Sequence, residues 1–261
     1  VPLSCQSKPT SHGQWKKRKK EEMRNSDQTD FKKFGKAECA KSVAIFIVNY
    51  ILCMALVLLF MWLNSLRAEH DLLEYLRANF NSVVYLLSSV FMLFITVYFY
   101  YIFEDPSVLA NPKNIWLIFS LLFSGIVLCY FFGYFFNIYS RPIAMLALLA
   151  LTLLGRRDAI FLNVIFALMM FSIDYFSNYS SINAYENALN STPLMTFSAG
   201  MVAIFVGSKV KTRLRSFLTG FAVCIPILIM TACLEYQNGA QMGYLLLFGI
   251  EAGVLSAVLF M

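Results

Sequence analysis

The sequence predicts an all-α membrane protein, a polytopic bundle of about eight transmembrane helices with both termini in the cytoplasm. Three observations support this fold class. Hydrophobic residues make up 59% of the 261-residue chain and charged residues only 14%, whereas a soluble domain carries roughly 25% charged residues. Long apolar runs recur after the first 41 residues, and none shows the period of two that a membrane barrel requires. The basic residues cluster in the polar segments that separate these runs.

The first 41 residues are polar and basic and show no apolar periodicity, so we expect a disordered cytoplasmic tail. The cluster Lys16–Lys20 has two interpretations. It either binds anionic lipid headgroups or is a solvated segment that only fixes the orientation of the chain. The net charge of +6 comes mostly from this tail, and we therefore expect no nucleic-acid partner.

Eight apolar segments follow the tail. A membrane-spanning helix needs about 20 apolar residues, so the fourth and sixth segments are expected to recruit flanking residues or to lie deeper in the bundle. The approximate segments are Val43–Leu63, Phe80–Phe103, Ile115–Phe136, Pro142–Leu154, Ala159–Phe176, Leu194–Ser208, Leu214–Leu234 and Gly243–Met261. The first is too long for a cleaved signal peptide and is expected to be an uncleaved anchor.

The expected domain organisation follows from these segments. A tail occupies 1–41, the anchor helix with a short outer segment occupies 42–79, and a seven-helix transmembrane domain occupies 80–261. Six residues in two basic turns are the expected topology anchors: Arg156, Arg157, Lys209, Lys211, Arg213 and Arg215. With the N-terminus inside, the inner segments hold 18 of the 21 basic residues. We therefore predict a multi-pass protein of the cell membrane with a cytoplasmic N-terminus.

The stretch "LTLLGRRDAIFLNV" is interpreted as a tight cytoplasmic turn. Gly155 is expected to end one helix, and Asp158 is expected near the start of the next, where a negative charge is favoured. Arg156 and Arg157 are expected to reach the headgroup level.

The sequence contains no group of residues with catalytic or metal-ligand spacing. Its two histidines, His12 and His70, lie in the tail and in an outer loop, and no HExxH, P-loop or GxSxG motif occurs. The six cysteines have no CxxC spacing and are expected to be small apolar residues. We therefore predict no catalytic residue, no metal site and no cofactor in this chain.

Two polar residues inside apolar runs are candidate intramembrane sites, because burial in a bilayer is costly for polar groups. Glu251 lies among Gly249, Gly253 and Ser256, a small-residue spacing that favours close helix packing. This carboxyl has two interpretations, a proton or ligand site, or a structural group that is protonated or hydrogen-bonded to a neighbouring helix. Asn163 is expected to form an interhelical hydrogen bond.

Four other residues are interpreted as structural. Asp174 and Glu235 fall at the outer ends of apolar segments, so we expect water to reach them. Pro226 is expected to kink the seventh helix, either as a functional hinge or as a tolerated proline. Pro142 is expected at a helix start, where proline is well accommodated.

The order of three stretches resembles a known family. The stretches are "FYYIFEDPSVLANPKNIWLIFSLL", "YSRPIAMLALLALTLLGRRDAIFLNVIFALMM" and "MTFSAGMVAIFVGSKVKTRLRSFLTGFAVCIPILIMTACLE". Together they make residues 80–261 similar to the seven-transmembrane region of bacterial membrane-bound HD-domain phosphohydrolases, a family that includes cyclic di-AMP phosphodiesterases. The resemblance implies an anchor helix, an extracellular sensor domain, seven helices and a cytoplasmic HD hydrolase domain. In this chain only about 15 residues, "SLRAEHDLLEYLRAN", separate the anchor from the next helix.

The resemblance implies a membrane sensory or anchoring module of an HD-type cyclic-dinucleotide phosphodiesterase. No catalytic residue is carried over, because the metal-binding His and Asp positions of the family lie outside this chain. The expected partners are the lipid bilayer and a cytoplasmic HD domain or signalling protein. The sequence leaves open whether the chain forms a homo-oligomer. The gene is expected to continue in frame beyond Met261 into an HD motif.

Two other functions stay open at this point. A small multi-pass transporter or permease would use Glu251 and Asn163, although no internal repeat supports it. A membrane scaffold without independent activity is the third hypothesis.

Overall fold

The protein is all-helical over the part of the chain that the computed structural model describes. The described residues are 36–67, 72–105, 108–109, 111–176, 186–208, 213–234, 236 and 242–260. The helices are α2 (Lys36–Arg67), α3 (Leu72–Ala78), α4 (Phe80–Glu104), α6 (Pro112–Phe135), the 3-10 helix η1 (Ile138–Ser140), α7 (Met145–Leu153), α8 (Arg156–Phe176), α9 (Glu186–Gly207), α10 (Arg213–Leu234) and α11 (Met242–Phe260). The predicted fold class, a polytopic membrane bundle of α-helices, is confirmed.

Each of the eight predicted apolar segments corresponds to one helix. Within the described ranges, five of them, α2, α4, α6, α8 and α11, are long and apolar enough to cross a membrane, and the remaining apolar stretches 138–153, 191–207 and 218–234 are shorter. The helix α2 begins at Lys36, six residues before the predicted start of the anchor. The short outer segment contains the seven-residue helix α3.

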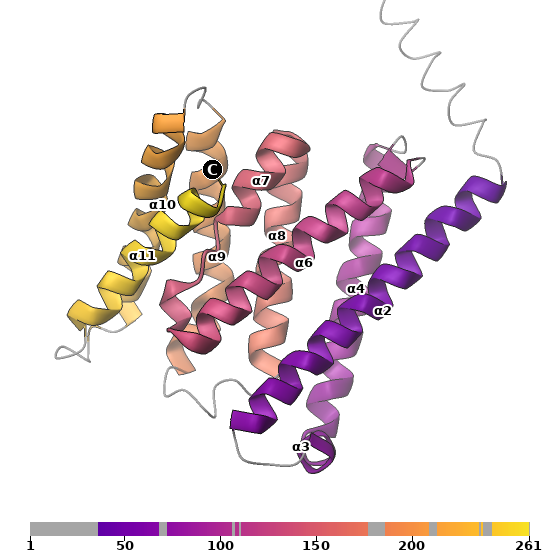
Figure 1. The fold of residues 1–261 in the computed structure, drawn as a ribbon, viewed down its shortest axis with the longest axis horizontal. Coiled ribbons are helices and arrows are strands. Elements are labelled where there is room, and N and C mark those ends of the chain that lie inside the picture. The colour runs from indigo at the N-terminus through magenta and orange to yellow at the C-terminus, as the bar shows by residue number, and fades with distance from the viewer. Residues whose placement is uncertain are drawn as a thin grey trace, which may run out of the picture.

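The long helices run alternately between two ends of the bundle (Figure 1). The first residues of α2 and the last residues of α11 point toward the same end. The helices α2 and α4 lie at one side of the bundle, and α10 and α11 lie at the other. Between them, α7 packs against α6, α8, α9 and α11.

The central helix α7 is short and surrounded by protein. Its nine residues rise about 13.5 Å, less than half of a hydrocarbon core of roughly 30 Å. It is preceded by non-helical backbone at 141–144, and every residue from 138 to 148 is buried. Non-helical backbone is tolerated at membrane depth only where protein or a water-filled cavity surrounds it. The buried position of 138–148 meets this requirement.

The anchor helix α2 is held to α6 by aromatic and polar contacts. The rings of Phe60 and Tyr130 stack with their centroids 3.7 Å apart. The Tyr130 hydroxyl lies 2.7 Å from Oδ1 of Asn64 and 3.0 Å from the carbonyl oxygen of Phe60. Because Asn64 is fully buried, these contacts supply the partner that a buried amide needs.

Candidate functional site

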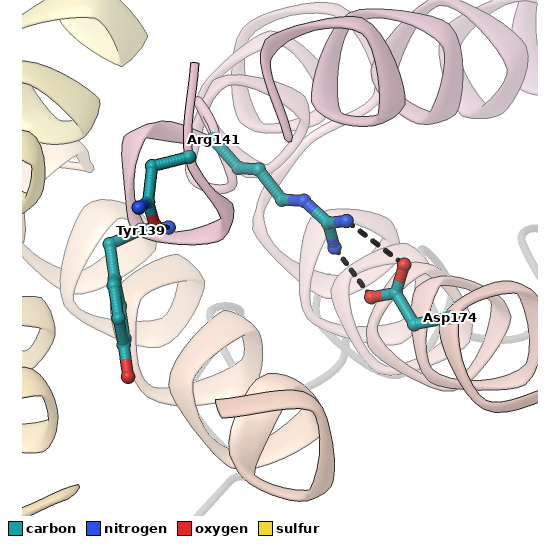
Figure 2. A network of polar contacts seen from close by, with 4 residues as sticks. Tyr139, Arg141 and Asp174 are labelled. Carbon is teal, nitrogen blue, oxygen red and sulfur yellow. Dashed lines mark hydrogen bonds and ion pairs between the residues drawn. The ribbon is translucent and has the colours of Figure 1, made fainter. Parts of the chain in front are cut away.

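A buried ion pair joins the segment before α7 to the last turn of α8. The Arg141 Nη1 atom lies 2.5 Å from Oδ2 of Asp174, and Nη2 lies 3.0 Å from Oδ1 (Figure 2). The two side chains are 0% and 1% exposed. The guanidinium therefore binds the carboxylate with two parallel hydrogen bonds, a geometry that fixes the relative position of both groups.

The local sequence directs the Arg141 side chain into the bundle. The Asn137 side chain accepts a hydrogen bond from the backbone N–H of Tyr139, 3.1 Å away, and so starts η1. The backbone of Arg141 is then extended, with φ −65° and ψ 132°. The following Pro142 favours an extended conformation at the preceding residue, because its ring would clash with a helical one. A helix end followed by a proline thus turns the arginine away from the path of α6.

Gly133 provides the space for the guanidinium on α6. A Cβ atom at this position would collide with the Nε and Nη2 atoms of Arg141. Three segments, α6, 138–141 and α8, therefore meet around one arginine side chain. The site requires glycine at 133 for this close approach.

The prediction that water reaches Asp174 is wrong. The residue does lie near the end of α8, but the Arg141 guanidinium binds its carboxylate and the residue is only 1% exposed. A position near the end of an apolar run does not reveal such a partner, because Arg141 lies 33 positions away in the chain. The opposite charges of "YSRP" and "SIDYF" at the same predicted end were the signal that could have identified the pair.

The same short segment also contacts the C-terminal helix. Helix η1 packs against α11, and its residues Ile138 and Tyr139 are 4% and 1% exposed. Figure 2 shows the Tyr139 side chain pointing away from Arg141. The segment 138–141 thus connects the Asp174 end of α8 to α11, through side chains that leave the backbone in different directions.

Asn163 lies at the contact of α8 with α9. Its Nδ2 atom donates a hydrogen bond to the carbonyl oxygen of Phe197, 3.1 Å away, and the residue is fully buried. A Cβ atom at Gly200 would collide with the Asn163 amide. The structure therefore gives Asn163 an interhelical hydrogen bond, with α9 close enough to α8 that only glycine fits opposite the amide.

Glu251 lies on α11 and is partly buried. Its small neighbours Gly249, Gly253 and Ser256 are buried, and a Cβ atom at Gly253 would collide with the sulfur of Cys224 on α10. The small residues around Glu251 thus allow close packing of α10 and α11. Asn163 contacts α9, so the structure places the two candidate intramembrane residues in different helix contacts.

The predicted turn at 155–158 is present, with partners on neighbouring helices. Gly155 has a positive φ of 105°, and Asp158 lies in the first turn of α8. Arg157 forms an ion pair with Glu104 of α4. The guanidinium carbon of Arg156 lies 4.8 Å from the ring centre of Phe205 on α9. The sequence did not show that these topology anchors also contact α4 and α9.

The remaining topology anchors lie at or beyond the limits of the described residues. Lys209 and Lys211 lie outside them, as do Glu235 and the cluster Lys16–Lys20. Arg213 and Arg215 belong to the first turn of α10, and their side chains are not among those described.

Among the residues that the structure describes, no group of three or more His, Cys, Asp or Glu side chains could hold a metal ion. The Arg141 guanidinium and the Asp174 carboxylate use their facing atoms for each other. The ion pair and the close approach at Gly133 thus hold α6, 138–141 and α8 in a fixed arrangement.

Comparison with models of protein families identifies a family that this chain matches. A family model described as "7TM receptor with intracellular HD hydrolase" matches residues 80–261, the region from α4 to the C-terminal end of α11. No curated protein and no solved structure shows a match to this chain.

Proposed function

The chain belongs to the family of seven-transmembrane receptors with an intracellular HD hydrolase, and we propose that its membrane domain regulates the hydrolysis of a cyclic dinucleotide, cyclic di-AMP. The family match is the observation that links this membrane domain to a hydrolase. The nucleotide itself is proposed from the resemblance to cyclic di-AMP phosphodiesterases.

The proposed orientation places the N-terminus and the end of α11 in the cytoplasm of a cell-membrane protein. Two observations support it. The first residues of α2 and the last residues of α11 point toward the same end of the bundle (Figure 1). The inner segments in this orientation hold 18 of the 21 basic residues, as the positive-inside rule expects. An HD hydrolase that follows or contacts α11 would then lie in the compartment that contains its nucleotide substrate.

The contacts of segment 138–141 suggest how a signal is transmitted. In the proposed orientation, this segment lies at the outer end of the bundle, where Arg141 binds Asp174. A signal that favours a second arrangement of 138–141 would also change the contact of η1 with α11. A ligand shifts such an equilibrium only by its difference in affinity for the two states. The movement of α11 would then reach the cytoplasmic hydrolase.

The hydrolysis of cyclic di-AMP by the purified chain together with its HD hydrolase tests this proposal. The chain is purified from its native membrane together with any associated HD protein, and cleavage of cyclic di-AMP is measured with cyclic di-GMP as the control substrate. We expect selective cleavage of cyclic di-AMP, and a change in rate in an Asp174→Asn variant. An associated HD hydrolase that prefers another nucleotide would contradict the assignment of cyclic di-AMP as the substrate. A hydrolysis rate that Asp174→Asn leaves unchanged would contradict the transmission of the signal through 138–141.

The genomic sequence around the coding segment is a second test. An HD motif in frame with the chain, or in a neighbouring gene whose product co-purifies with it, supports the proposal. The lack of an HD protein both in the gene neighbourhood and among the purified partners would contradict it. Reporter fusions at the end of α11 and within 177–193 test the orientation, and we expect only the second fusion to lie outside the cell.

A further inference from the structure

A groove on the outer surface of α6 lies apart from the site described above. Its volume is about 410 Å³, and it is formed by one face of α6 with Leu52 of α2 at its side. Figure 1 shows α2 and α6 running side by side, and the two helices are in contact. The volume falls within the range of roughly 300–1,000 Å³ that is typical of small-molecule sites.

The residues that line the groove recur at helical spacing. They include Trp116, Ser120, Ser124 and Val127 on α6, three or four positions apart and therefore on one face. The two serines are smaller than the aromatic and branched residues around them, which leaves the hollow. The Ser124 hydroxyl donates a hydrogen bond to the Leu121 carbonyl oxygen, 2.9 Å away in the same helix. The polar group of Ser124 is thus satisfied, and the floor of the groove suits an apolar occupant.

The groove has the length of one leaflet of a bilayer. From Trp116 to Leu128, α6 rises about 18 Å, and half of a hydrocarbon core is about 15 Å. Trp116 is 43% exposed near the start of α6, a position typical of tryptophan at the level of lipid headgroups. The groove therefore runs from the headgroup level toward the middle of the membrane.

Positive charge lies at the headgroup end of the groove. Lys113 is exposed and precedes Trp116 by three residues, so both lie on the same face of α6. Lys41 is exposed and precedes Leu52 by eleven residues, about three turns of α2. Helices α2 and α6 begin at the same end of the bundle. Lysines near the membrane surface attract anionic lipids, which matches an apolar groove below them.

We propose that this groove holds one acyl chain of an anionic phospholipid whose phosphate group is bound by Lys113, with Lys41 adding positive charge. The acyl chain would lie along the exposed face of α6, beside Leu52 of the anchor helix α2. It would bind independently of the nucleotide on which the associated hydrolase acts.

Tryptophan quenching in reconstituted membranes tests the proposal. The sequence has three tryptophans, Trp15, Trp62 and Trp116, so a Trp15→Phe/Trp62→Phe variant reports on the groove alone. The full chain is placed in phosphatidylcholine vesicles that contain increasing fractions of brominated phosphatidylglycerol or of brominated phosphatidylcholine. The matched control is Trp15→Phe/Trp116→Phe, which keeps Trp62, a residue 43% exposed near the other end of α2.

We expect half-maximal quenching of Trp116 at an about fivefold lower fraction of brominated phosphatidylglycerol than of brominated phosphatidylcholine, as one lysine near an anionic surface provides. Trp62 should show equal quenching by the two lipids. Lys113→Gln should reduce the preference, and Ser120→Leu/Ser124→Leu should remove it by filling the groove. These substitutions change exposed or half-exposed positions of α6.

Two results would overturn the proposal. One is equal quenching of Trp116 by both brominated lipids, which would mean that the groove contacts bulk lipid only. The other is a preference that persists in both Lys113→Gln and Ser120→Leu/Ser124→Leu, which would place the anionic lipid elsewhere on the protein.

Discussion

Arg141 and Asp174 lie about 33 residues apart in the chain and form a bidentate ion pair that is almost completely enclosed by protein. Removing two charges from water costs several kcal/mol for each ion, and their attraction repays this cost only in good geometry. The pair is therefore weak evidence for high stability. It is strong evidence for a defined position of segment 138–141, because either charge alone would be left buried without its partner.

Removal of one partner should destabilise the protein more than removal of both. We expect Asp174→Ala to lower the free energy of unfolding by about 3–5 kcal/mol, because it leaves a buried guanidinium without its carboxylate. Arg141→Met/Asp174→Leu should recover a large part of this loss, since no charge then remains buried. Thermal unfolding in detergent measures both effects. The control is Arg157→Gln at an exposed ion pair, which should change stability little.

Gly133 should not tolerate even a methyl group. A Cβ atom there would collide with the Arg141 guanidinium, so Gly133→Ala must shift the guanidinium from its position. We expect a loss of about 1–3 kcal/mol, the usual cost of overpacking. Gly243→Ala is the matched control, because a Cβ at that glycine of α11 meets no atom within 4 Å. Equal melting temperatures of the two variants would contradict the close approach at Gly133.

Because Gly200 contacts Asn163, we expect Asn163→Ala to restore all of the stability that Gly200→Ala removes. The three atoms nearest to a Cβ at Gly200 all belong to the Asn163 side chain. Gly200→Ala should therefore destabilise the protein, and the same substitution should be nearly neutral when Asn163→Ala is already present. A double-mutant cycle on unfolding free energies should give a coupling of about 1–3 kcal/mol. Additive effects would show that the two residues are not in contact.

At the contact between α10 and α11, we expect Cys224→Ala to restore only part of the stability that Gly253→Ala removes. A Cβ at Gly253 would collide with the Cys224 sulfur and would also lie 2.8 Å from the Gly220 carbonyl oxygen. Cys224→Ala removes the first obstacle and leaves the second, which is backbone. We therefore expect Gly253→Ala to remain destabilising in the Cys224→Ala background, by a smaller amount. A complete rescue would mean that the helices are further apart than the structure shows.

Much of the fold could be predicted from apolar length and charge alone. The eight apolar segments form α2, α4 and α6–α11. In lipid, the backbone N–H and C=O groups of an apolar run must find their hydrogen-bond partners within the run, and a helix provides them. The turn at Gly155 was equally accessible, because a glycine after a helix and an acidic residue at the next helix start are local signals. The shortness of α7 was also visible in the sequence.

The site could not be predicted in the same way. The neighbours of Asp174 in the chain mark the end of an apolar run and predict contact with water, whereas the structure buries the residue and pairs it with Arg141. The contacts of Arg157 with Glu104 and of Arg156 with Phe205 likewise join helices that are distant in the chain. Such contacts depend on which helices become neighbours, and no local pattern contains that information.

The brevity of α7 has a consequence for the synthesis of the protein. A helix of about 13.5 Å cannot cross the membrane alone, and Arg141 leaves the ribosome 33 residues ahead of its partner on α8. A nascent chain that ends before Asp174 would carry an uncompensated arginine at the start of α7. We therefore expect α7 and α8 to be inserted as one unit, with the α7–α8 hairpin stable in the bilayer only once the second helix is complete.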